Sequence, residues 1–135
     1  MSHSSRHISV HVARPAAEVY AFAADPRNLT RWAAGLAGTT VAEVDGRWVT
    51  DSPMGRVTFT FAPPNDFGVL DHDVTLPDGQ TVHNPLRVLR DGDGSEVVFT
   101  LRHRPGMSED DVERDATAVA KDLATLKALV EGSDA

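Results

Sequence analysis

The chain has 135 residues, the size of one domain, and twenty acidic against thirteen basic residues give it a formal net charge of −7. This acidic balance argues against a nucleic-acid partner, and the absence of cysteine excludes disulfides, thiolate metal sites and a cysteine nucleophile. No apolar run reaches the roughly 18–20 residues that span a bilayer, and the polar start MSHSSRH lacks the apolar segment of a signal peptide. We therefore expect one cytoplasmic domain over residues 1–135, with residues 1–5 as a flexible tail.

A strand and two short helices are expected at the start of the chain. Residues 6–13 alternate between apolar and polar side chains, which predicts a half-buried strand. Pro15 suits the first turn of a helix, because its missing N–H costs nothing there. Asp25 ends this helix, because a residue before proline avoids the helical region, and it can cap a second short helix that begins at Pro26 and carries Trp32.

Six strands separated by turn signals are expected next. Aspartate-glycine pairs tolerate positive φ and mark hairpins at residues 45–46 and 91–94, while prolines mark the other turns. Strands joined by such tight turns are antiparallel neighbours. The expected strands are residues 41–44, 47–52, 56–62, 67–76, 81–90 and 96–104.

A long amphipathic helix is expected over residues 108–131. Ser108 and Asp111 resemble a capping box, and the apolar residues that follow recur at spacings of three and four. This stripe consists of Val112, Ala116, Val119, Leu123, Leu126 and Val130. Because the helix must bury the stripe against a sheet, the expected fold is α+β. It is a seven-stranded antiparallel sheet curved around the long C-terminal helix, with two short helices after the first strand.

Strings along nearly the whole chain carry a family resemblance. They are RPAAEVYAFAADPRNLTRWAAGL, SPMG, FGVLDHDVTLPDG, HNPLRV, GSEVVFTLRHRPGMSEDD and VAKDLATLKALVEG. In combination they resemble the SRPBCC superfamily of START lipid-transfer domains, aromatic polyketide cyclases, birch-pollen-allergen-like proteins and activators of the Hsp90 ATPase. The chain is most similar to the small single-domain bacterial members. The resemblance implies a helix-grip fold and a small hydrophobic ligand, without naming a substrate.

Strand alternation and the resemblance together predict the wall of a ligand cavity between sheet and helix. The same side chains can also form a solid core. Trp32 could close the mouth of the cavity. The expected ligand-binding residues are Trp32, Trp48, Phe59, Phe61, His72, Val74, Asn84, Leu86, Phe99, Leu101, His103, Val119 and Leu123.

His72 and Asn84 are polar groups on otherwise apolar strand faces, and a buried polar group without a partner costs roughly 1–3 kcal/mol. In an enzyme, His72 could act as acid or base beside a carbonyl, and Asn84 could bind the resulting enolate oxygen. These two are the candidate catalytic residues. His72 can equally be a core histidine with a satisfied partner, and Asp71 and Asp73 should point to the opposite face.

No metal and no cofactor are expected. His72, His83 and His103 lack the short spacing of metal ligands, and we expect His83 to be exposed. The leading hypothesis is binding of an aromatic polyketide-like, lipid or sterol-like molecule. The first alternative is a cyclase or dehydratase that uses His72, and the second is a protein-interaction module of the Hsp90-activator type. Homodimerisation is left open.

Overall fold

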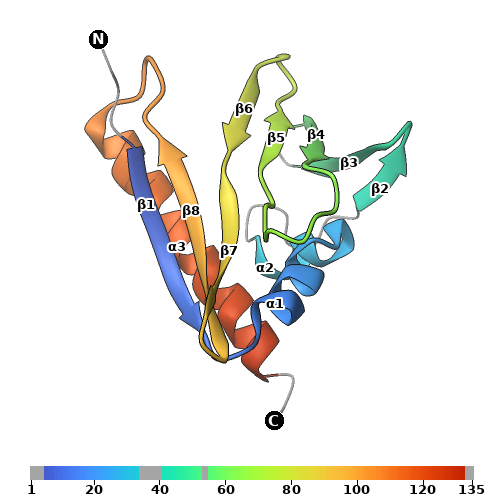
Figure 1. Cartoon of the computed structure of the whole chain (residues 1–135). Coiled ribbons are helices and arrows are strands. Elements are labelled where there is room, and N and C mark those ends of the chain that lie inside the picture. The colour runs from blue at the N-terminus through green and yellow to red at the C-terminus, as the bar shows by residue number, and fades with distance from the viewer. Residues whose placement is uncertain (1–4, 34–40, 53–54, 133–135) are drawn as a thin grey trace.

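The computed structural model describes residues 5–33, 41–52 and 55–132, and shows antiparallel sheets wrapped around a long C-terminal helix (Figure 1). The strands are β1 (Ser5–Val12), β2 (Val41–Val44), β3 (Arg47–Ser52), β4 (Gly55–Phe61), β5 (His72–Thr75), β6 (Thr81–Asn84), β7 (Leu86–Asp91) and β8 (Gly94–Arg102). The helices are α1 (Ala16–Ala23), the 3-10 helix η1 (Pro26–Asn28), α2 (Leu29–Trp32) and α3 (Glu109–Gly132). This arrangement confirms the α+β helix-grip fold. Ser5 begins β1, and the rest of the expected tail lies outside the described residues.

The described strands form two sheets where the sequence predicted one. A three-stranded sheet has the order β1-β8-β7, and a five-stranded sheet has the order β2-β3-β4-β5-β6. Pro85 splits the expected strand 81–90 into β6 and β7, because proline has no N–H for the ladder. The expected seven strands are therefore eight.

The expected strand 67–76 is shared between the two sheets. Its second half is β5, but its first half lies against β7. There the N–H of Leu70 donates to the carbonyl of Leu86 at 2.8 Å, and the N–H of Val88 donates to the carbonyl of Gly68 at 2.9 Å. This segment therefore joins the two sheets on the side where Pro85 separates them.

Turn and cap chemistry follow the sequence closely. Asp45 and Gly46 both have positive φ, 53° and 79°, in the hairpin between β2 and β3. At the start of α3 the N–H of Asp111 donates to Ser108 Oγ at 3.1 Å, and the N–H of Ser108 donates to Asp111 Oδ2 at 3.0 Å. Both predictions are confirmed. The turn expected before Gly55 lies largely outside the described residues.

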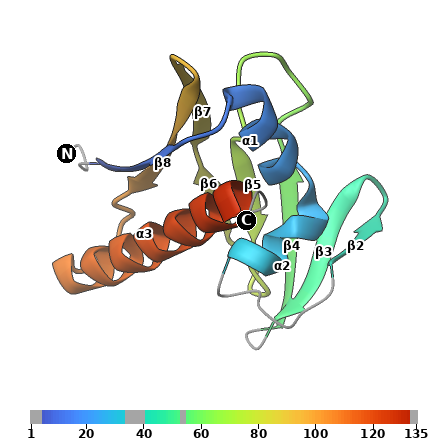
Figure 2. The same cartoon turned by 90° about the horizontal axis from the view of Figure 1, so that it is seen from below.

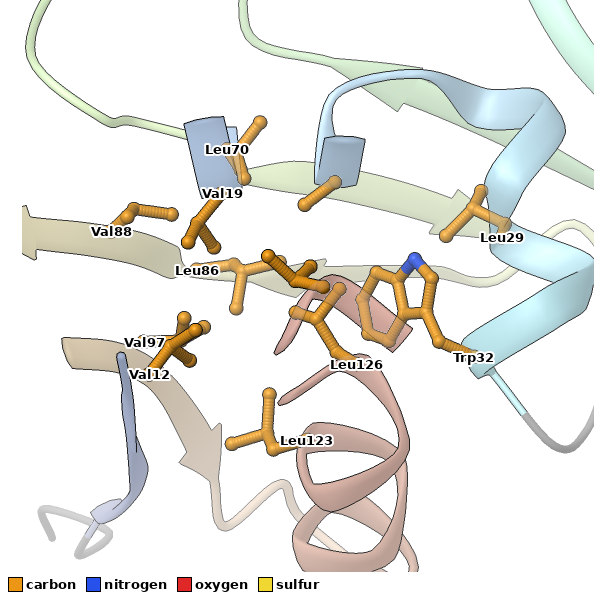
Figure 3. Close-up of a cluster of buried hydrophobic side chains, with 12 residues drawn as sticks. Val12, Val19, Leu29, Trp32, Leu70, Leu86, Val88, Val97, Leu123 and Leu126 are labelled. Carbon is orange, nitrogen blue, oxygen red and sulfur yellow. The ribbon is translucent and has the colours of Figure 1, made fainter. Parts of the chain in front are cut away.

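The hydrophobic core lies where the C-terminal half of α3 meets α1, α2 and the three-stranded sheet (Figure 3). The predicted stripe of α3 is confirmed, because its members are buried or half-buried. The core cluster is Val12, Val19, Ala23, Leu29, Trp32, Leu70, Leu86, Val88, Val97, Leu123, Leu126 and Val130. In the part of the chain that the structure describes, no helix is long and apolar enough to cross a membrane.

Hydrogen bonds fasten the C-terminal end of α3 to the end of β1. Glu131 Oε2 accepts from the N–H of Ala13 and from Lys127 Nζ, both at 2.7 Å. Lys127 Nζ also donates to the carbonyl of His11 at 2.7 Å, and Arg14 donates to the carbonyl of Glu131 at 3.0 Å. The hydrogen bond from Ala13, followed by that from Lys127, lowers the pKa of Glu131. The C-terminal end of α3 is thus attached to the rest of the fold, and Figure 2 shows it beside α1 and α2.

Candidate functional site

The inner face of the five-stranded sheet carries two cross-strand rows of side chains. The first row is Trp48, Phe59, Val74 and Val82, and the second is Phe61, His72 and Asn84. Side chains at directly opposed positions have Cβ atoms about 4.5–5.5 Å apart, so each row is a series of neighbours. The register therefore brings the two candidate catalytic residues, His72 and Asn84, side by side.

A cavity of about 290 Å³ lies between this face, the end of β8 and the N-terminal half of α3. Its volume is at the lower end of the range for small-molecule sites, about 300–1,000 Å³. Five of the expected ligand-binding residues line it, namely Val74, Asn84, Phe99, Leu101 and Val119. Its wall also holds apolar Val82 and Leu76, so most of its interior is apolar.

The other expected residues lie beside this cavity or away from it. Trp32, Leu86 and Leu123 belong to the core cluster, and Phe59 is also buried. Trp48, Phe61 and His72 share the rows of the inner face without lining the cavity. His103 turns toward the loop before α3, where its Nε2–H donates to the carbonyl of Met107 at 2.8 Å. Contact of these residues with a ligand stays a prediction.

His72 is held in one orientation and one tautomer. Its Nδ1 lies 3.0 Å from the carbonyl of Leu70, which can only accept, so Nδ1 carries the proton and Nε2 of the neutral ring is an acceptor. The ring packs against Phe61 with centroids 5.2 Å apart. Burial lowers the pKa of His72, against the weaker opposing effects of the Leu70 carbonyl and Asp71. His72 is therefore a neutral base at neutral pH.

Asp71 acts as a clamp between β7 and the segment before β5. Its Oδ1 accepts from the N–H of Leu86 at 3.0 Å, and its two oxygens accept from Arg87 at 2.8 and 2.7 Å. The hydrogen bonds from Arg87 are the largest cause of a lowered pKa at Asp71. The clamp bridges the break at Pro85. Sequence reasoning missed this clamp. The available signal was an acidic residue, Asp71, in one expected strand and a basic residue, Arg87, just after Pro85 in the next expected strand.

Asp73 and His83 form a pair next to that of His72 and Asn84 in the ladder of β5 and β6, and His83 also borders the cavity. They are register partners, with Asp73 Oδ1 2.6 Å from His83 Nδ1, and their side chains are 48% and 57% exposed. The expectation that His83 is exposed is confirmed. Within residues 5–33, 41–52 and 55–132, no group of three or more His, Asp or Glu side chains could hold a metal ion.

Trp32 contributes a buried donor to the interior. Its side chain is only 7% exposed, and its Nε1 has no hydrogen-bond acceptor among the described residues. Figure 3 shows the six-membered ring toward Leu126 and the nitrogen away from it. A buried donor left unpaired costs roughly 1–3 kcal/mol.

A family model described as "Polyketide cyclase / dehydrase and lipid transport" matches residues 5–131 of the chain. A search of the curated proteins found no sequence that matches this chain.

Solved structures share the fold over almost the whole chain. XoxI from Bacillus cereus aligns with a TM-score of 0.71 and 12% identity, over 100% of this chain and 99% of that one. Ara h 8.0201 aligns with a TM-score of 0.68 and 12% identity, over 94% and 97%. DynU16, from the dynemicin biosynthetic locus, aligns with a TM-score of 0.69 and 15% identity, over 95% of this chain but only 48% of that one. At such low identities the likeness is one of fold.

Proposed function

The chain belongs to the family of polyketide cyclases, dehydrases and lipid-transport proteins, and from this premise we propose that it binds a small, largely apolar molecule between its five-stranded sheet and α3. The family match agrees with the SRPBCC resemblance of the sequence. The observation that carries the proposal is the cavity of about 290 Å³, whose wall combines a mainly apolar surface with the amide of Asn84 and with several charged side chains. Apolar surface combined with polar groups at defined places is typical of sites that bind a largely apolar molecule in one orientation.

The size of the cavity favours a compact ligand. A volume of about 290 Å³ suits a small ring system better than a sterol or a two-chain lipid. The aromatic polyketide-like class named from the sequence meets this limit, and DynU16 comes from a biosynthetic locus. Ring carbonyls and hydroxyls would also supply partners for Asn84.

Binding is tested first with the protein as purified. Native mass spectrometry, compared with the denatured mass, is expected to show a small molecule that is released on denaturation. Calorimetry then measures the affinity for 2-naphthol, a two-ring aromatic alcohol that is neutral at pH 7. Binding is expected, because the two rings replace water on an apolar wall.

A pocket-filling variant links this binding to the cavity. Val74→Phe places a ring in the cavity and is expected to weaken 2-naphthol binding at least tenfold. Val44→Phe is the matched control, because Val44 is 46% exposed on the hairpin of β2 and β3. Equal binding by the two variants, or no binding by the unmodified protein, would exclude this site.

A second candidate function is catalysis by His72 with Asn84. It is favoured by the neutral, oriented imidazole of His72 and by the register that sets Asn84 beside it. The base would take a proton next to a carbonyl of the ligand, and the amide would donate to the oxygen that becomes negative.

The variant His72→Gln distinguishes catalysis from binding without a reaction. With the copurified molecule as substrate, His72→Gln is expected to abolish turnover and change affinity less than threefold if the protein is an enzyme. His11→Gln, at an exposed position that does not line the cavity, is the control. Unchanged turnover in His72→Gln would eliminate this role.

A further inference from the structure

Two arginines stand at the opening of the cavity where β8 ends. Arg102 is the last residue of β8 and Arg104 follows it by two residues, and both line the cavity. Within the described part of the chain, neither guanidinium takes part in an ion pair, unlike those of Arg6 and Arg87. Two cations thus lie next to an apolar interior with their charge uncompensated by a near carboxylate.

The opposite wall of the opening carries negative charge. Asp115 and Asp122 lie seven residues apart on α3, on the helix face that also brings Val119 to the cavity. Neither forms an ion pair within 4.0 Å with Arg102 or Arg104 among the described residues, so the two walls stay separate. The opening is therefore positive on the strand side and negative on the helix side.

This charge arrangement selects the polar end of a ligand. The chain as a whole has a net charge of −7, so its overall field does not attract anions, and among the described lining residues the two arginines are the permanently charged cations. A guanidinium binds a carboxylate through two parallel N–H donors, which adds direction to the charge attraction. Asp115 on the opposite wall would repel that carboxylate and keep it on the strand side.

We propose that the ligand is an amphipathic carboxylate, an inference that rests on the proposed binding function and names its substrate class. Its apolar body lies against Val74, Phe99 and Leu101, and its carboxylate binds between Arg102 and Arg104. Apolar contacts inside the cavity supply the affinity for the ligand's apolar body. The two arginines determine which end of the ligand lies at the opening.

The test compares 2-naphthoate with 2-naphthol, which share both rings and differ in charge at pH 7. Calorimetry at low ionic strength is expected to show about tenfold tighter binding of 2-naphthoate, the size of one partly exposed charge-assisted contact. The Arg102→Gln/Arg104→Gln variant is expected to lose this preference and keep its affinity for 2-naphthol.

The matched control removes two arginines elsewhere. Arg47 and Arg56 border a different hollow, beside Val49 and Thr58. The variant Arg47→Gln/Arg56→Gln also removes two positive charges, so it makes the same change in net charge away from the cavity. It should keep the preference for 2-naphthoate. Thermal unfolding checks that both double variants are folded, and the single variant Arg102→Gln, at an exposed position, is expected to lose part of the preference.

The outcomes distinguish the two proposals. Equal affinity for both compounds in the unmodified protein, or a preference that survives in the Arg102→Gln/Arg104→Gln variant, overturns the carboxylate assignment and leaves the binding function standing. Failure of both compounds to bind overturns both proposals. A preference lost equally in the control variant would assign the effect to net charge and also overturn the assignment.

Discussion

The two halves of α3 do different work. Its C-terminal half buries Leu123, Leu126 and Val130 in the core and is fastened to β1 by the hydrogen bonds of Glu131. Its N-terminal half borders the cavity through Val119 and neighbouring polar residues. The difference teaches that one amphipathic helix can close the fold at one end and leave room for a ligand at the other.

The largest effect should come from the closed half. Leu123 is 1% exposed, so Leu123→Ala is expected to lower the free energy of unfolding by about 2–5 kcal/mol. Val119→Ala, four residues earlier at the cavity wall, should cost less than about 1 kcal/mol, because Val119 is only half-buried and packs against the core on one side alone. Urea denaturation measures both. Similar costs would mean that the two halves do not differ.

The Asp71 clamp stabilises the junction of β7 with the segment before β5, in the sheets that face the N-terminal half of α3. Asp71→Ala removes the acceptors for Leu86 and Arg87, and is expected to cost about 1–2 kcal/mol in the same denaturation experiment. The control is Asp73→Ala, whose pair with His83 is about half exposed and should contribute about 0–1 kcal/mol. An equal loss in the two variants would contradict the clamp.

His72 should make stability depend on pH in a defined window. Its pKa is lowered in the folded protein, so between that value and its ordinary value, about 6.5, the unfolded chain binds more protons. Stability is therefore fully present above about pH 6.5 and declines as the pH falls toward the folded pKa. The melting temperature should fall more from pH 7.5 to 5.5 in the unmodified protein than in His72→Gln. Parallel falls would show that His72 is not the group that titrates.

The smallest effects concern the attachment of the helix ends. Glu131→Gln weakens the hydrogen bonds to Ala13 and Lys127, so the melting temperature should fall. Glu113→Gln breaks only the exposed pair with Arg6, and the melting temperature should change less. Hydrogen exchange should show faster opening of the last turns of α3 in Glu131→Gln alone. Faster exchange in the first turns of α3 instead would contradict the role of Glu131 in attaching the C-terminal end of the helix.

Local patterns in the sequence were enough to decide which residues share a face. Strand alternation predicted that His72 and Asn84 lie on one face, and helix periodicity predicted the buried stripe of α3 that includes Leu123. Turn and cap residues such as Asp45 and Ser108 act within a few residues of themselves, so they too were readable.

Only the tertiary structure decided how far those faces stand from each other. The split at Pro85, the burial of Trp32 in the core, and the place of Arg102 at the cavity opening depend on contacts between distant segments. A residue's face follows from its own backbone period, but the space in front of that face follows from the position of α3. That position is set by the packing of α3 on β1, α1 and α2, which no local pattern contains.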